Sequence, residues 1–304
     1  MKSDSNVLIK FAKACVAVCR HSRMPLFSNK YSKKLYKQYQ HMCVFMLMKK
    51  ERKHYRTVIQ LLEIAPDLVR AIGLKRLPHY TTLQKFFRRF STVLFERILS
   101  QTAKLFGLSG LVAIDSTGFS SSHASRYFMM IKYRRKKHVW KDAYVKNSIT
   151  ADVEKQVILA SKPRKDKGHD TLDFVPLMRR TAKNAGVKTV IADKGYDSEA
   201  NHEFVRNVMK ADSVIPVRRM GGKGKVSGRF RKEMAKKRDK KTYKKRQGIE
   251  TVFFVMKAVF GDTVYSRSTR QQKKELKSIC VAYNLYRYAK TCFMWEVFYS
   301  RVYT

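Results

Sequence analysis

Two short apolar runs that each end in an aspartate constrain the fold of this chain most strongly. Residues 111–114 lead into Asp115, and residues 187–192 lead into Asp193. Runs of this length that are rich in Val, Ile and Leu are typical of buried strands. A partly buried carboxylate costs free energy unless a partner compensates its charge. We therefore expect each aspartate to end a strand, to be followed by a tight turn, and to converge with the other at one edge of a sheet.

The segments around these two runs predict the rest of a mixed sheet. Residues 140–149 and 156–161 are expected to form the arms of a hairpin with its turn near Asp152, and 213–217 a further buried strand. Apolar residues at helical spacing predict helices at 172–185, 204–209, 247–260 and 279–298. Three antiparallel strands followed by alternating helix and strand predict an α/β fold, a mixed β-sheet flanked by helices.

Residues 1–107 are expected to form a separate all-helical domain. After Pro78, Thr81 and Thr82 are candidate N-caps for a helix whose apolar residues at 83, 86, 87 and 90 share one face. The other face would carry Lys85, Arg88 and Arg89. This pattern predicts a helix–turn–helix in which these three cations contact DNA. A pair of basic helices with a purely structural role is the alternative.

The charge of the chain predicts a polyanionic partner. The 304 residues contain 66 Lys and Arg against 23 Asp and Glu, which gives a net charge of +43. Such a charge repels itself in a compact fold, and it is typical of nucleic-acid binders. Residues 218–246 alone hold fifteen Lys or Arg, and we expect them to be a DNA-contacting arm rather than a solvated loop. No apolar run approaches the roughly 20 residues that a membrane span needs.

The cysteines and the first residues predict a reducing compartment. There are five cysteines, an odd number, and no CxxC pair. Residues 1–4 do not lead into the apolar segment of a secretory signal, so we expect a cytoplasmic protein. Cys15 and Cys19, one helical turn apart, are interpreted as core residues in preference to metal ligands.

Glu250 is a third acid in an informative setting. It lies in the predicted helix 247–260, and Tyr243, Arg246 and Lys257 are spaced so that all four return to one face of a helix. Apolar residues on the opposite face would be buried. A solvent-exposed Arg–Glu pair is the alternative, since such pairs are common on helix surfaces.

This spacing resembles the Y-(2)-R-(3)-E-(6)-K signature of insertion-sequence transposases, a family with a DDE active site on an RNase H-like fold. Residues 112–117 resemble the motif of the family's first aspartate, and residues 191–198 resemble that of the second. The resemblance covers about 108–290, which would be the catalytic domain and would include the basic arm 218–246. Residues 291–304 would then be a C-terminal helical tail. The long β-rich insertion that some relatives carry before the glutamate is absent.

The resemblance implies metal-dependent cleavage and strand transfer on double-stranded DNA by in-line phosphoryl transfer. Asp115, Asp193 and Glu250 would be the catalytic residues and would bind two Mg²⁺ ions, with Mn²⁺ as a substitute. The residues that contact the DNA would include Tyr243, Arg246, Lys257 and Lys194. The substrates would be the terminal inverted repeats of a prokaryotic mobile element and its target DNA. A homodimer would bring two ends together, on the nucleoid.

Two other functions stay open on the sequence alone. A general RNase H-like nuclease would explain the three acids, but not the tyrosine, arginine and lysine at their fixed offsets. A DNA-binding relative that is inactive or adapted by its host would bind the same DNA without cutting it.

Overall fold

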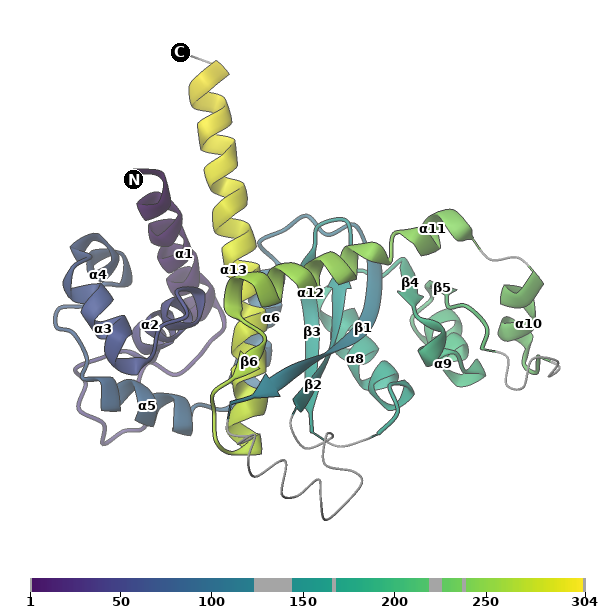
Figure 1. The fold of residues 1–304 in the computed structure, drawn as a ribbon, viewed down its shortest axis with the longest axis horizontal. Helices are drawn as coiled ribbons and strands as arrows, with labels where there is room; N and C mark the ends of the chain where they lie inside the picture. Colours follow the sequence, from purple (N-terminus) through teal and green to yellow (C-terminus); the bar gives the residue numbers. More distant parts are fainter. Residues whose placement is uncertain (1, 123–143, 166–167, 219–225, 237–238, 303–304) are drawn as a thin grey trace. The chain divides into compact units, whose positions relative to one another are not determined.

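The computed structural model describes residues 2–122, 144–165, 168–218, 226–236 and 239–302 (Figure 1). The chain forms two compact units. Unit 1 comprises Met1–Leu105, Val259–Gly261 and Ser278–Thr304, and unit 2 comprises Phe106–Ala258 and Asp262–Lys277. Residues 278–290, which the family resemblance assigns to the catalytic part, therefore belong to unit 1 by their contacts.

Unit 1 is helical, as its sequence predicts. Its helices are α1 (Lys2–His21), α2 (Gln38–Lys50), α3 (Tyr55–Glu63), α4 (Pro66–Ile72), α5 (Tyr80–Arg89), α6 (Thr92–Ala103) and the greater part of α13 (Thr269–Val302). Helix α2 is buried on all sides from Gln38 to Met48, which makes it the central helix of this core. Cys15 and Cys19 are free and buried, so their prediction as core residues is confirmed.

Helix α5 has the amphipathic character that its spacing predicts. Leu83, Phe86 and Phe87 are buried, and the side chains of Lys85, Arg88 and Arg89 lie on the exposed face. The helix begins at Tyr80 with His79 as N-cap, two residues before the first predicted cap, so the prediction of a threonine cap was wrong. The His79 ring and the Thr81 hydroxyl instead hydrogen-bond each other at 2.8 Å. The role of this helix as a DNA reader stays a prediction.

Unit 2 contains the predicted mixed sheet. Its strands are β1 (Leu111–Ser121), β2 (Tyr144–Asp152), β3 (Val157–Arg164), β4 (Thr189–Ala192), β5 (Asp212–Val214) and β6 (Thr263–Val264). The order is β3-β2-β1-β4-β5, in which β1, β2 and β3 are antiparallel and β4 and β5 run parallel to β1. Residues 112–114 and 190–192 are buried without alternation, as expected for central strands that are covered on both faces.

One strand differs from its predicted length. Strand β1 continues seven residues beyond Ile114, so Asp115 lies inside a strand and the tight turn expected after it is absent. Residues 116–120, which apart from Phe119 are small or polar, stay extended because they pair with 144–148 of β2. Strand β4 does end at Ala192, and Asp193 follows it as expected. Residues 140–143 of the predicted hairpin lie outside the described residues.

The helices of unit 2 include those predicted at 172–185, 204–209 and 247–260, together with several short helices and turns that were not predicted. They are α8 (Thr171–Asn184), the 3-10 turn η2 (Lys194–Tyr196), α9 (Glu199–Glu203), the π-helical turn η3 (Phe204–Val208), α10 (Arg229–Lys236), α11 (Lys240–Lys244) and α12 (Gln247–Phe260). Helix α8 packs on β2 and β3. Within the basic stretch 218–246, the described residues form α10 and α11 rather than an entirely irregular loop.

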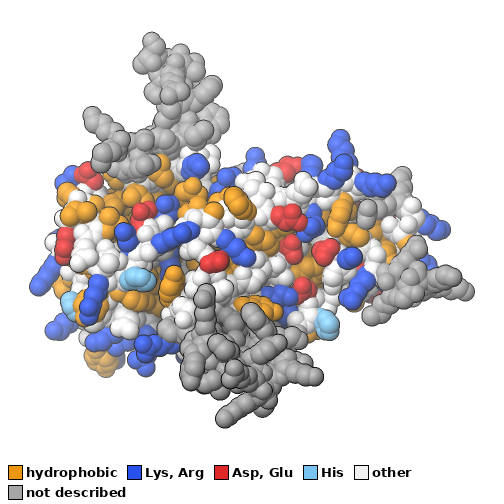
Figure 2. All heavy atoms as spheres, viewed as in Figure 1, with side chains coloured by type: hydrophobic (Ala, Val, Ile, Leu, Met, Phe, Trp, Pro, Cys, Tyr) orange, Lys and Arg blue, Asp and Glu red, His pale blue; other side chains and the backbone are white. Residues whose placement is uncertain are grey.

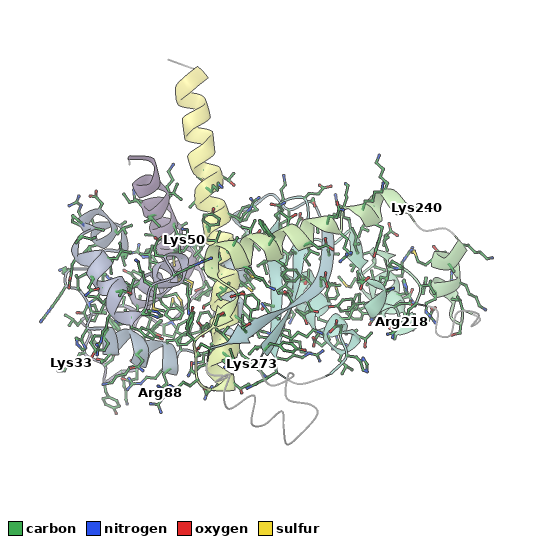
Figure 3. All side chains as sticks on the ribbon, in the orientation of Figure 1. Lys33, Lys50, Arg88, Arg218, Lys240 and Lys273 are labelled. Atoms are coloured by element: carbon green, nitrogen blue, oxygen red, sulfur yellow. The ribbon has the colours of Figure 1, made fainter. Side chains whose placement is uncertain are left out.

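Basic side chains dominate the surface. In the face drawn in Figure 2, Lys and Arg side chains are spread over both units and acidic ones are few. Figure 3 labels examples, among which Lys33, Arg218 and Lys240 are exposed. No described helix is long and apolar enough to cross a membrane.

Helix α12 packs closely against the residue after strand β2, and the contact is made at Gly248. A Cβ atom added to Gly248 would lie 2.8 Å from both the Cβ and the carbonyl oxygen of Val153, the residue that follows β2. Real Cβ atoms do not approach other atoms this closely, so only glycine allows this contact. The contact sets the distance between the helix that carries Glu250 and the sheet that carries Asp115.

We expect Gly248→Ala to lower the melting temperature. Helix propensity alone would make alanine more stable by about 1 kcal/mol, but overpacking against Val153 costs about 1–3 kcal/mol. Thermal unfolding by circular dichroism measures the balance. Gly186→Ala is the matched control, because nothing lies within 4 Å of a Cβ at Gly186. A rise in melting temperature for Gly248→Ala would show that α12 does not rest on Val153.

Candidate active site

Parallel pairing of β1 with β4 brings the two predicted aspartates together. Ile114 pairs with Ala192, so Asp115 and Asp193 follow at the same level of neighbouring strands. The Asp115 side chain is 23% exposed. Its Oδ1 accepts a hydrogen bond from the Ser116 backbone N–H at 2.8 Å. The predicted convergence of these two residues therefore arises from register, although only Asp193 stands at the end of its strand.

Arg246 joins Glu250 to Asp115. Its Nη1 donates to Asp115 Oδ2 at 3.0 Å, and its Nη2 donates to Glu250 Oε1 at 2.5 Å. Arg246 lies in the two-residue turn between α11 and α12, and Glu250 lies in the first turn of α12. Two of the three acids singled out by the sequence thus contact one guanidinium group, and Asp193 contributes to its electrostatics without a direct contact being present among the hydrogen bonds and ion pairs of Arg246 with the described residues.

The surroundings of Asp115 disfavour its ionised form. Burial raises the pKa of Asp115, and the negative charges of Asp193 and Glu250 raise it further, against the Ser116 N–H and Arg246, which favour the ionised form. Burial disfavours the charged form of Arg246, but Asp115 and Glu250 raise the pKa of the guanidinium overall. Negative charge is therefore concentrated here, in a protein that is basic elsewhere.

The remaining residues of the predicted stripe do not share one continuous helix. Tyr243 belongs to α11, which Asp239 caps by accepting a hydrogen bond from the Thr242 N–H. Between α11 and α12 the backbone bonds run from residue i to i−3, as from Arg246 N to Tyr243 O, which tightens the chain into a turn. The expectation of a single helical stripe from Tyr243 onward was therefore wrong, although Arg246, Glu250 and Lys257 keep their spacing.

Two further predicted DNA contacts lie near these acids in sequence. Lys194 is exposed in η2, directly after Asp193. Lys257 is half-buried in α12, with its Nζ 5.6 Å from the centre of the Phe119 ring. Both assignments to DNA stay predictions.

The donor set fits a hard divalent cation. Asp115, Asp193 and Glu250 offer only carboxylate oxygens, the ligands that Mg²⁺ and Mn²⁺ prefer. Burial is the main cause of the raised pKa of Asp115, and the charges of Asp193 and Glu250 add to it. Among the described residues, however, no three His, Cys, Asp or Glu side chains are already gathered as a metal site. The guanidinium of Arg246 lies among these carboxylates instead.

A second polar layer lies beside Asp115, and sequence patterns did not predict it. Ser116 Oγ donates to Asp170 Oδ2 at 3.4 Å, and Lys146 forms an ion pair with Asp170. Asp173 is fully buried, where Arg164 Nε lies 3.1 Å from its Oδ2. The sequence indicates only that Asp170 and Asp173 are acids at a helix N-terminus, but their cationic partners come from β2 and β3. No local pattern could indicate this, because each pair joins different elements.

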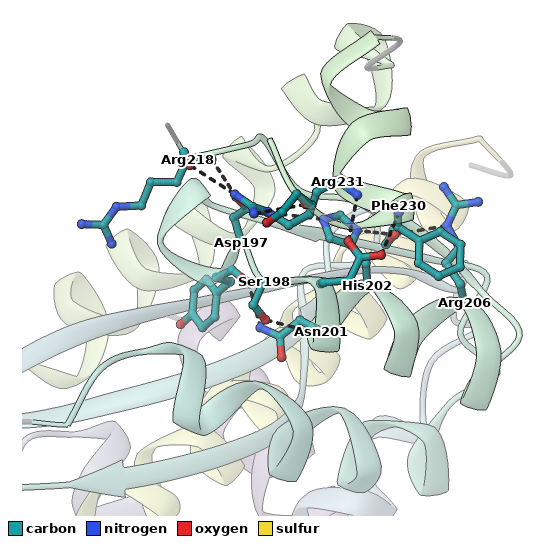
Figure 4. Close-up of polar contacts among 12 residues, drawn as sticks. Asp197, Ser198, Asn201, His202, Arg206, Arg218, Phe230 and Arg231 are labelled. Atoms are coloured by element: carbon teal, nitrogen blue, oxygen red, sulfur yellow. Dashed lines mark hydrogen bonds and ion pairs between the residues drawn. The ribbon is translucent and has the colours of Figure 1, made fainter. Parts of the chain in front are cut away.

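The loop after Asp193 is anchored by a buried ion pair (Figure 4). The Asp197 side chain is fully buried and accepts hydrogen bonds from Arg231 Nη2 at 2.8 Å and from the Arg218 N–H at 2.8 Å. Glu199 caps α10 by accepting from the Phe230 N–H at 2.9 Å. Sequence patterns gave no indication of this buried role for Asp197. It connects the loop of the second predicted catalytic aspartate to the basic stretch.

We expect Asp197→Asn to lower the free energy of unfolding by about 2 kcal/mol at pH 7, because a buried charged hydrogen bond is removed. Burial opposes ionisation, but hydrogen bonds from His202 and Arg231 outweigh it and lower the pKa of Asp197 to about 2. Because this folded-state pKa is depressed, the stabilisation is present above the unfolded value of about 4 and is lost as the pH falls toward 2.

Urea unfolding of wild type and variant at several pH values measures this difference. The matched control is Asp212→Asn, which breaks a pair between Arg206 and an aspartate side chain that is 69% exposed and should cost less than about 1 kcal/mol. An equal loss of stability in both variants would contradict a special role for Asp197.

Comparison with known proteins agrees with this geometry. Residues 107–285 match the family model described as transposase DDE domain, which is more than half of the chain. Neither the comparison with curated proteins nor that with solved structures found a match. The match covers every strand of the mixed sheet and also Asp115, Asp193 and Glu250. The chain therefore belongs to the transposase DDE-domain family.

Proposed function

We propose that this protein is the transposase of a prokaryotic insertion sequence. It would bind the ends of its element and catalyse metal-dependent strand cleavage and strand transfer. The observation that carries this proposal is that strand register places Asp193 beside Asp115, while Arg246 bonds Asp115 to Glu250. Three acids of this kind suit phosphoryl transfer, and the surplus of cations elsewhere suits DNA.

In this proposal the three carboxylates bind two divalent cations, Mg²⁺ or Mn²⁺. Cations bound there would activate the attacking water or 3′-hydroxyl and stabilise the leaving oxygen during in-line displacement. Arg246 and Lys257 would bind phosphates next to the scissile bond, Arg246 through its two-pronged guanidinium group and Lys257 as a point charge. Tyr243 and Lys194 would contact the same DNA strand from α11 and η2.

The rest of the chain would position the DNA. Residues 1–107 would recognise the terminal inverted repeats through Lys85, Arg88 and Arg89, which are exposed on α5. The basic stretch 218–246 would follow the backbone of the end or of the target. Two copies of the protein, one for each element end, would form the synaptic complex, and the complex would act on the nucleoid.

We expect purified protein to nick linear DNA that carries the flanks of its own gene, at the tips of the repeats, in Mg²⁺ and not in EDTA. Asp115→Asn, Asp193→Asn and Glu250→Gln should each lower the cleavage rate about 10³-fold or more. The reason is that metal-bound charge stabilisation contributes several kcal/mol and each 1.4 kcal/mol is a factor of ten. Gel analysis of end-labelled DNA measures the rate.

Asp67→Asn is the control for this experiment, since Asp67 is an exposed acid of α4 that pairs within its own helix with Arg70. Binding of the ends without cleavage in any metal would support the inactive DNA-binding relative instead. Cleavage without preference for the repeat tips would support a general nuclease.

We expect the salt dependence of DNA binding to report the role of α5. Replacing Lys85, Arg88 and Arg89 together by alanine should flatten the plot of log affinity against log salt by about 0.9 for each phosphate that is no longer neutralised. Fluorescence anisotropy with a labelled repeat measures this slope. Lys104→Ala, which removes an exposed lysine just after α6, is the control. An unchanged slope in the triple variant would show that these three residues of α5 do not contact DNA.

A further inference from the structure

Arg246 lies between Asp115 and Glu250, two of the three carboxylates that would accept a cation in the proposed function. Its guanidinium bonds to Asp115 Oδ2 at 3.0 Å and to Glu250 Oε1 at 2.5 Å, and its side chain is only 21% exposed. An arginine whose only role is to bind DNA phosphate would be expected to be exposed to solvent when no DNA is bound. This one is instead held against acids of opposite charge.

Both carboxylate oxygens of Asp115 are already engaged. Oδ1 accepts from the Ser116 backbone N–H at 2.8 Å, and Oδ2 accepts from Arg246. The bond to Ser116 is local and follows from the strand, since the two residues are adjacent. The bond to Arg246 is the one that a competing cation can replace. Because Glu250 is bound by the other terminal nitrogen of the guanidinium group, Nη2, a single movement of the Arg246 side chain frees both acids.

The position of Arg246 allows such a movement. It contacts both acids through its guanidinium group alone, so rotation of the side chain breaks these two bonds and no backbone hydrogen bond. A guanidinium group removed from two carboxylates needs a new anionic partner, and the phosphate backbone of DNA is the partner that the proposed function supplies. The same residue can therefore neutralise the acids in one state and a phosphate in the other.

We propose that Arg246 is an internal counter-ion of the metal-free protein, which a divalent cation displaces and which then binds a DNA phosphate. The inference rests on the proposed function. Metal and DNA both favour the state in which Arg246 has left the acids, so each must raise the affinity for the other by the same factor. The protein is thereby kept from presenting bare, mutually repelling carboxylates when no metal is bound.

Two titrations of the full-length protein test this inference. In the first, without DNA, calorimetry with Mn²⁺ should show about fivefold or tighter binding in Arg246→Gln than in wild type, because the competing cation is gone. In the second, Ca²⁺ should raise the affinity of wild type for a labelled element end about fivefold or more. It should leave the affinity of Arg246→Gln unchanged. Arg246→Lys, which keeps the charge but not the two-pronged group, should lie between them in both.

Lys194→Gln is the matched control, because it removes one positive charge next to Asp193 from an exposed position. Equal tightening of Mn²⁺ binding in Lys194→Gln and Arg246→Gln would overturn the inference, since the removal of any nearby charge would then explain the effect. A Ca²⁺-dependent gain in DNA affinity that persists in Arg246→Gln would overturn it as well. If wild type and Arg246→Gln bind no Mn²⁺ at all, the proposed function itself fails together with the inference.

Discussion

The parallel pairing of β1 with β4 is the constraint on which the rest of the site depends. Its register ends with Ile114 opposite Ala192, so the next residue of each strand is an aspartate. Strand β1 is also held by β2 on its other side, and its apolar residues 112–114 are completely buried. A one-residue slip would turn these side chains to the opposite face and separate the acids. The hydrophobic sheet therefore places the carboxylates, and no contact between the carboxylates themselves is needed for this.

Some of the arginines of this basic chain form ion pairs with acids of the protein itself. Three acids of unit 2, Asp115, Asp173 and Asp197, are each paired with an arginine that comes from a different element. Such pairs fix the loops around the sheet, because a buried carboxylate without its partner is costly. In this transposase DDE domain many of the remaining described lysines and arginines are exposed, although Lys274 and Lys277 are buried.

Local patterns predicted much of the fold because they act over a few residues. The apolar runs before Asp115 and Asp193 became β1 and β4, and the spacing of Leu83, Phe86 and Phe87 became the buried face of α5. Prediction failed where pairing overruled local preference. Residues 116–120 have turn-like composition, yet β2 holds them extended. The break between α11 and α12 was missed for the same kind of reason, since it depends on i to i−3 bonds that residue periodicity does not reveal.

By itself the sequence determined the residue types, their spacing and the class of fold, because side-chain periodicity and burial preference are properties of neighbouring residues. It therefore identified Asp115, Asp193 and Glu250 as candidates. Only the tertiary structure decided what lies among them. Arg246 meets Asp115 across 131 residues of chain, and Arg231 meets Asp197 across 34. Charge attraction and packing act through space, and the folded sheet alone decides which distant side chains come within their reach.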